Sequence, residues 1–201
     1  RWRLAFILLA ILAVTSVLGL NSTKATIDPD PTSQPERDYA ALLRTPNLWL
    51  TFVYVFCTYG AITYYLFRLP VSLADSDIKV VGVGLILSVL WLTFSALSSL
   101  LRNIVDGPHV RTVMLVAPLL IAAGLTLLNK NDSLPLLLLS AVFVGAGLAC
   151  SNSPSTQMIL RFAPKGMSAV STSLDITFAR LGGIATVTFL AGTDVAIAIP
   201  V

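Results

Sequence analysis

The chain has 201 residues, of which 56% are hydrophobic and only 11% are charged, and its mean hydropathy is +0.85. About a quarter of the residues in soluble domains are charged, so this composition excludes an ordinary soluble globular protein. The net charge is +3, but no basic patch interleaved with aromatic residues lies outside the apolar stretches, which argues against nucleic acid as a partner.

Long uncharged stretches follow one another along the chain. The five that contain no charged residue are 4–23, 45–67, 80–101, 112–129 and 133–160. A sixth, 166–193, is interrupted only by Asp175 and Arg180. A helix needs about 20 apolar residues to cross a bilayer, whereas the strands of a membrane barrel alternate over about ten. The sequence therefore predicts an all-α, polytopic transmembrane bundle of about six spans in the lipid bilayer.

The segment between the first two apolar stretches is hydrophilic and contains three prolines, which is typical of a flexible linker. Its second half, 34–43, fits two structures: a disordered linker, or a short amphipathic helix on the membrane surface. The apolar side of that helix would be Tyr39, Leu42 and Leu43. The first apolar stretch is counted as a true span and not a signal peptide, because five more follow it.

The later connections are short, so neighbouring spans are expected to be antiparallel and the loops to alternate between two sides. The side of the linker collects seven basic residues and the other side five. The seven are Lys24, Arg37, Arg44, Arg102, Arg111, Arg161 and Lys165. By the positive-inside rule, the linker is predicted to be cytoplasmic.

Arg180 is the most informative single residue. It lies about 18 Å along a helix that begins near Ser168, close to the bilayer midplane, where a charge costs about 2.5–3.5 kcal/mol on insertion scales. Asp175 is a poor partner within the same helix, because five positions separate the two side chains by about 140°. Two interpretations stay open: Arg180 or Asp175 lines a substrate or ion path, or Arg180 forms a structural pair with another helix.

Polar residues are concentrated in Ser151–Gln157, within the fifth stretch. Asn152 and Thr156 are four positions apart and share a helix face, as do Ser153 and Gln157. Pro154 removes a backbone donor in the middle of this segment. The segment predicts either one side of a water-filled cavity or a set of small polar side chains that bridge helices.

The second stretch contains Tyr59, which is deep enough to face a cavity or to pack in the core. Tyr64 and Tyr65 lie nearer its end and are expected to join an interfacial aromatic belt. Gly60, and the glycines of Gly82-x-Gly84, Gly145-x-Gly147 and Gly182–Gly183, are expected to let helix backbones approach closely.

Residues for enzymatic chemistry are scarce. His109 is the only histidine, Asp175 is the only carboxylate within a predicted span, and the two cysteines both lie in apolar stretches. No metal-binding motif is present. We therefore expect neither an enzyme nor a cofactor or metal site.

The loop Ile104–Arg111 resembles the motif G-x-x-x-D-R-x-G-R-R of the major facilitator superfamily. Asp106 and Arg111 keep an acidic and a basic position, whereas Gly107 replaces an arginine and His109 a glycine. The resemblance implies that Asp106, His109 and Arg111 belong to a cytoplasmic gating loop, which has lost one basic residue of its charge cluster.

Other segments resemble the same family in the same order. Arg1–Arg3 is similar to the element before its sixth helix, and Leu43–Asn47 to the end of its central linker. Gly145-x-Gly147, Ala163–Gly166 and Arg180–Gly183 are similar to its tenth and eleventh helices in drug exporters. The resemblance implies three parts: 1–20 as the sixth helix, 21–46 as the cytoplasmic linker, and 47–201 as helices seven to eleven with the start of the twelfth.

The resemblance implies secondary transport of a small molecule by alternating access, with proton-coupled efflux of a drug-like or metabolite substrate across the plasma membrane. A substrate path would use Arg180, Asp175, Asn152, Thr156, Gln157 and Tyr59, with either Asp175 or a carboxylate of the missing half as the proton carrier. The chain is expected to be a fragment of a 12-helix protein that lacks its amino-terminal six-helix half, and to be unable to transport alone. The alternative is a non-transporting receptor or assembly partner with the same fold.

Overall fold

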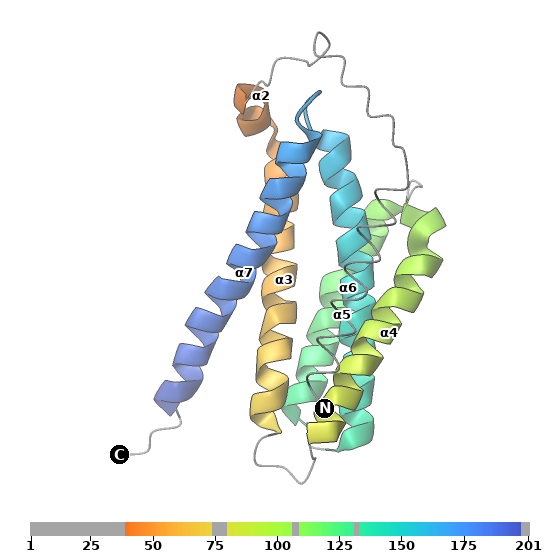
Figure 1. Cartoon of the computed structure of the whole chain (residues 1–201), viewed down its shortest axis with the longest axis vertical. Helices are drawn as coiled ribbons and strands as arrows, with labels where there is room; N and C mark the ends of the chain where they lie inside the picture. Colours follow the sequence, from red (N-terminus) through yellow and green to blue (C-terminus); the bar gives the residue numbers. More distant parts are fainter. Residues whose placement is uncertain (1–38, 74–79, 106–108, 131–132, 198–201) are drawn as a thin grey trace, which may run out of the picture. The chain divides into compact units, whose positions relative to one another are not determined.

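The computed structural model describes residues 39–73, 80–105, 109–130 and 133–197 (Figure 1). These ranges are helical apart from short turns and contain no strand, so the all-α prediction is confirmed. The helices are α2 (Tyr39–Arg44), α3 (Pro46–Ser72), α4 (Val80–Val105), α5 (Val110–Lys130), α6 (Leu134–Phe162) and α7 (Ser168–Ile197). The apolar stretch 4–23 and most of the linker lie outside the described residues.

Each long helix coincides with one apolar stretch and begins or ends at a residue that suits a terminus. Pro46 and Pro135 lie in the first turns of α3 and α6, where the missing N–H of proline has no helical partner to lose. Between α6 and α7, Gly166 has φ of 77°, a left-handed conformation that favours glycine. The turn at Gly166 joins α6 to α7 within a few residues.

Four described helices are long and apolar enough to cross a membrane: Pro46–Ser72, Val81–Arg102, Val110–Leu128 and Leu134–Phe162. The helix α7 is long enough but falls outside this set. It carries Asp175, Arg180 and several serines and threonines, which lower its hydropathy, although Leu181, Ile184 and Phe189 are exposed on it. Large apolar side chains elsewhere point outward, including Leu92, Leu115 and Leu119, as expected of a lipid-facing surface.

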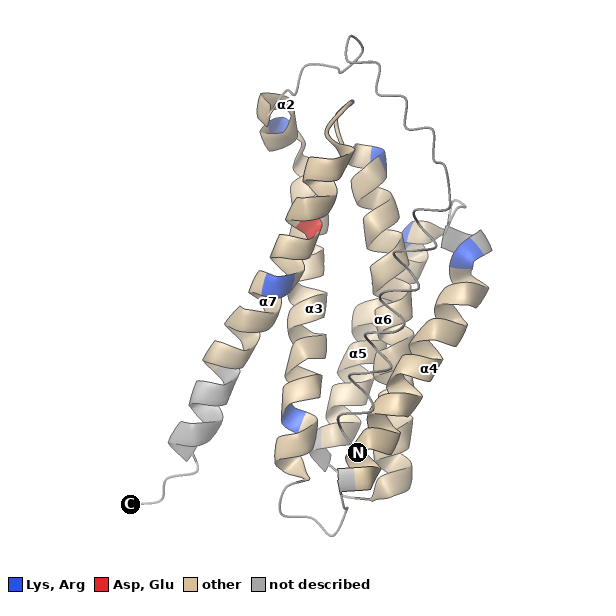
Figure 2. Ribbon diagram, in the orientation of Figure 1, with Lys and Arg blue, Asp and Glu red and all other residues tan. Residues whose placement is uncertain are grey.

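Successive long helices run in opposite directions (Figure 1), as the short connections predict. Basic residues consequently gather at one end of the bundle: Arg44 and Arg161 lie in the last turns of α2 and α6, Arg102 in the last turn of α4, and Arg111 at the start of α5. Figure 2 shows blue segments at helix ends of this side of the bundle and a red segment on α7. Asp175 of α7 is the one acidic residue among those whose side chains the structure describes.

The helices form two groups. The helix α3 packs mainly along α7, and α6 packs mainly along α4 and α5. Glycines lie at the close approaches inside each group: a Cβ on Gly182 would collide with the Phe56 backbone, and one on Gly145 would lie 2.5 Å from the Leu90 carbonyl oxygen. The predicted role of the glycines is therefore confirmed at these positions. It is wrong for Gly84, which has no neighbour within 4 Å of such a Cβ.

Two apolar clusters join the groups, one toward each end of α3. One contains Ile62, Tyr65 and Leu69 with residues of α4, α5 and α6, and the other contains Leu48, Phe52 and Val55 with Ile159 and Met167. The second cluster also buries Leu42 of α2, whereas Tyr39 and Leu43 are exposed. Of the two structures that fitted 34–43, a short helix forms over Tyr39–Arg44, but only one of its three apolar residues is covered, and 34–38 lie outside the described residues.

Tyr65 does not join the interfacial aromatic belt that the sequence predicts for it. It is fully buried, and its hydroxyl lies 3.2 Å from Oγ of Ser140, which also lies 2.8 Å from the Gly124 carbonyl oxygen. The aromatic-belt prediction is wrong for this residue, because a polar partner on α6 satisfies its hydroxyl inside the bundle. Tyr64, its neighbour, is half-buried.

Candidate functional site

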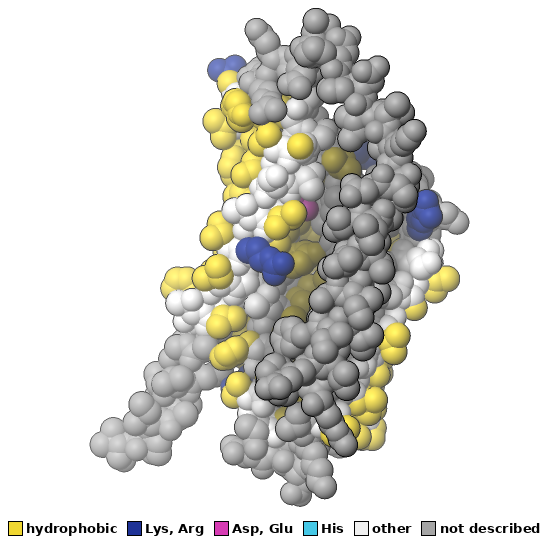
Figure 3. Space-filling model, viewed as in Figure 1, with side chains coloured by type: hydrophobic (Ala, Val, Ile, Leu, Met, Phe, Trp, Pro, Cys, Tyr) yellow, Lys and Arg dark blue, Asp and Glu magenta, His cyan; other side chains and the backbone are white. Residues whose placement is uncertain are grey.

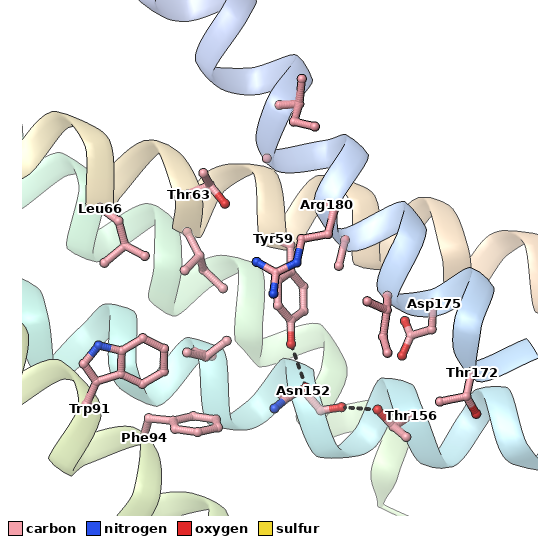
Figure 4. Close-up of a pocket in the computed structure, with 16 residues that line it drawn as sticks. Tyr59, Thr63, Leu66, Trp91, Phe94, Asn152, Thr156, Thr172, Asp175 and Arg180 are labelled. Atoms are coloured by element: carbon pink, nitrogen blue, oxygen red, sulfur yellow. Dashed lines mark hydrogen bonds between the residues drawn. The ribbon is translucent and has the colours of Figure 1, made fainter. Parts of the chain in front are cut away.

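A cavity of about 700 Å³ lies between the two helix groups. Its walls come from α3, α4, α6 and α7, and α5 contributes none (Figure 4). The polar or charged residues that line it are Tyr59, Thr63, Asn152, Thr156, Thr172, Asp175 and Arg180. Five of the six residues predicted for a substrate or ion path therefore lie on one cavity, and Gln157 is the exception.

Tyr59 and Asn152 connect the two groups across this cavity. The Tyr59 hydroxyl donates a hydrogen bond of 2.6 Å to Oδ1 of Asn152, and the Thr156 hydroxyl donates to the Asn152 carbonyl oxygen at 3.2 Å (Figure 4). Tyr59 both packs in the core and faces the cavity, since its ring contacts core residues while its hydroxyl reaches the cavity. A short hydrogen bond here fixes the separation of α3 and α6.

Asp175 is the only acidic residue among those whose side chains the structure describes. It is 9% exposed, its carboxyl lies beside the Thr156 hydroxyl, and its buried Oδ1 has no hydrogen-bond partner among the described groups. A buried acceptor without a partner costs about 1–3 kcal/mol, and more when charged. This carboxyl is therefore ready to accept a proton or a hydrogen bond from a ligand.

Arg180 lies about 7.5 Å further along α7 than Asp175. Its side chain is exposed and points into the space beside Tyr59, away from Asp175 (Figure 4). In the described part of the chain, no ion pair joins these two residues, as their spacing predicts. The cavity thus contains both an anionic and a cationic group that do not neutralise each other by contact.

The rest of the wall is apolar. Trp91 and Phe94 of α4 form an edge-to-face pair, with ring centroids 5.8 Å apart, on the side of the cavity opposite α7. Figure 3 shows a cationic side chain, and next to it a small part of an acidic one, beside hydrophobic surface. Sequence reasoning missed this pair. An i, i+3 aromatic pair within a span was the available signal, but it cannot be distinguished from core packing without the neighbouring helices.

The polar segment Ser151–Gln157 divides among several faces of α6. Asn152 and Thr156 line the cavity, whereas Ser151 is buried and donates to the Thr58 hydroxyl at 3.2 Å. Ser153 is exposed, and Gln157 is half-buried. Asn152 and Thr156 thus lie on the cavity wall and Ser151 bridges two helices, whereas the face of Ser153 and Gln157 does not line the cavity.

Of the predicted gating loop, Asp106 lies outside the described residues. His109 and Arg111 are both exposed at the start of α5, where the His109 carbonyl oxygen accepts the Val113 N–H at 3.1 Å. No group of three or more potential metal ligands occurs within the described ranges. Of the two cysteines, Cys150 is buried and Cys57 exposed, and neither forms a disulfide.

The helical bundle and its apolar outer surface are those of a multi-pass integral membrane protein. The model of the Major Facilitator Superfamily matches residues 1–187, and the chain therefore belongs to this family. Its members are membrane transporters of small molecules and not enzymes. No curated protein and no solved structure matches the chain significantly.

Proposed function

We propose that this chain is part of a secondary active transporter that exports a small molecule across the plasma membrane in exchange for protons, and that it comprises the carboxy-terminal half with the linker and the helix before it. The observation that supports this most directly is the cavity between α3, α4, α6 and α7, which contains two ionisable side chains within the bundle. Ionisable groups inside membrane bundles mark substrate and ion paths.

Alternating access requires a second group of helices that closes the other side of the site. In this proposal, residues 1–20 are the last helix of an amino-terminal half, 21–46 are a cytoplasmic linker, and 47–201 are the second half. The cavity then lies where the two halves meet. Asp106, His109 and Arg111 act in the cytoplasmic loop that holds one conformation and releases it.

Asp175 is the proposed proton carrier. The proton affinity of a carboxyl group changes with burial and with the charges near it. A movement that brings water or a ligand to Oδ1 of Asp175 would therefore change its protonation. Asn152, Thr156 and Tyr59 are proposed to contact the substrate, with Arg180 in its path and Gln157 as a more distant helix contact.

The test is transport by the full-length protein in vesicles with an imposed proton gradient. A panel of fluorescent cationic, anionic and zwitterionic dyes is followed for gradient-driven movement. Arg180→Gln should abolish it, and Asp175→Asn should leave only movement that ignores the gradient. Arg102→Gln, an exposed charge away from the cavity, is the matched control. Dye binding without movement of any dye would instead favour the receptor alternative.

A further inference from the structure

The cavity contains two opposite charges on one helix, and neither is paired with the other. Asp175 is nine-tenths buried with an unpartnered Oδ1, and Arg180 is exposed and lines the same space. Ligands that complement such a site bring a hydrogen-bond donor to the carboxylate and an acceptor to the guanidinium, because one is an acceptor when ionised and the other has only donors.

A ligand with a single charge satisfies only half of this arrangement. An isolated cation beside Asp175 makes no contact with Arg180, and an isolated anion beside Arg180 leaves Oδ1 of Asp175 without a donor. A buried acceptor without a hydrogen-bond partner costs free energy, and more when it is charged. A molecule that carries both charges supplies a partner to each residue and enters the cavity with no net charge.

The cavity wall opposite α7 indicates the chemistry of the uncharged part of the ligand. The Trp91–Phe94 pair and the side chains of Leu66 and Leu148 present aromatic and aliphatic surface. Aromatic pairs in edge-to-face or offset contact are stabilised beyond the effect of the area they bury. A volume of about 700 Å³ accommodates a small molecule with fused rings.

We propose that the cavity binds small amphipathic zwitterions, with the ammonium group on Asp175, the acidic group on Arg180, and an aromatic body against Trp91 and Phe94. This rests on the proposed function, because the cavity is taken as the transport site. It also adds a link between substrate and proton: a proton on Asp175 removes the partner of the ammonium group and weakens binding.

The test measures equilibrium binding by calorimetry, with the full-length protein in nanodiscs and no proton gradient. Three probes share a naphthalene ring. The first, 6-(aminomethyl)-2-naphthoate, is zwitterionic; the second, the methyl ester of the first, is only cationic; and the third, 6-methyl-2-naphthoate, is only anionic. The zwitterion should bind at least tenfold more tightly than either single-charge probe. Equal or tighter binding of a single-charge probe, or no binding of any probe, would overturn the proposal.

Substitutions of Asp175 and Arg180 test which residue contacts each charged end of the probe. Asp175→Asn should weaken the zwitterion and the ester about tenfold and leave the anion unchanged, and Arg180→Gln should weaken the zwitterion and the anion but not the ester. Arg102→Gln should change none of them. Equal loss of all three probes in either variant would indicate a structural role and contradict the assignment. Binding selectivity is independent of flux, so a failure of transport and a failure of this proposal are distinguishable.

Discussion

The Tyr59 hydroxyl on α3 and Oδ1 of Asn152 on α6 form a hydrogen bond of 2.6 Å that crosses the cavity between the two helix groups. The two residues are 93 positions apart in the chain. The bond links the α3–α7 pair to the group of α4, α5 and α6 where a ligand would enter. Its removal is therefore expected to alter both stability and binding.

Tyr59→Phe should lower the free energy of unfolding by about 1 kcal/mol, the usual net value of a hydrogen bond, and weaken binding of the naphthalene zwitterion severalfold. The measurement is a double-mutant cycle with Asn152→Ala, read by thermal unfolding and calorimetry. A coupling energy near zero between the two substitutions would show that the bond contributes nothing in the membrane.

Gly182→Ala should destabilise the bundle by about 1–3 kcal/mol, because its new methyl group would collide with the Phe56 backbone and force α3 and α7 apart. Gly84→Ala is the matched control. It meets nothing within 4 Å and should be neutral or stabilising, since alanine favours a helix over glycine by about 1 kcal/mol. Melting temperatures in detergent compare the two, and equal shifts would contradict the predicted close approach.

Asp175→Asn should abolish the coupling of transport to protons without lowering the stability of the fold. The amide keeps the size of the side chain but removes a buried charge, so the free energy of unfolding should stay the same or rise by about 1 kcal/mol. Transport should lose its dependence on the proton gradient. A variant that unfolds more easily and still couples normally would place Asp175 in a structural role.

Cysteine substitutions should distinguish water-facing from lipid-facing positions. In a background without Cys57 and Cys150, Thr172→Cys should react quickly with a charged, membrane-impermeant thiol reagent, because Thr172 lines the cavity. Leu119 has a larger exposed fraction than Thr172, but Leu119→Cys should react at least tenfold more slowly, since this side chain is expected to face lipid. Mass spectrometry after timed labelling gives both rates.

Much of the architecture was predictable, because a long uncharged stretch has few alternatives to a membrane helix. Asp175 and Arg180 were predictable candidates for the same reason, since a charge inside an apolar stretch is costly unless something requires it. The faces of the other residues were not predictable. A span that is apolar on all sides has no periodicity to show that Tyr65 is buried, that Gly84 faces outward, or that Trp91 faces a cavity.

The glycine approaches at Gly182 and Gly145 and the hydrogen bonds of Tyr59 and Ser151 occupy different places. The glycine approaches lie within a helix group, at Gly182 against α3 and at Gly145 against α4. The bonds of Tyr59 with Asn152 and of Ser151 with Thr58 lie between the groups. Substitutions at these glycines would therefore be selected against, because the protein would fail to fold. Substitutions of the hydroxyl residues would instead change the width of the cavity in a protein that still folds. The range of molecules this protein accepts can thus change over evolution without rebuilding its helices.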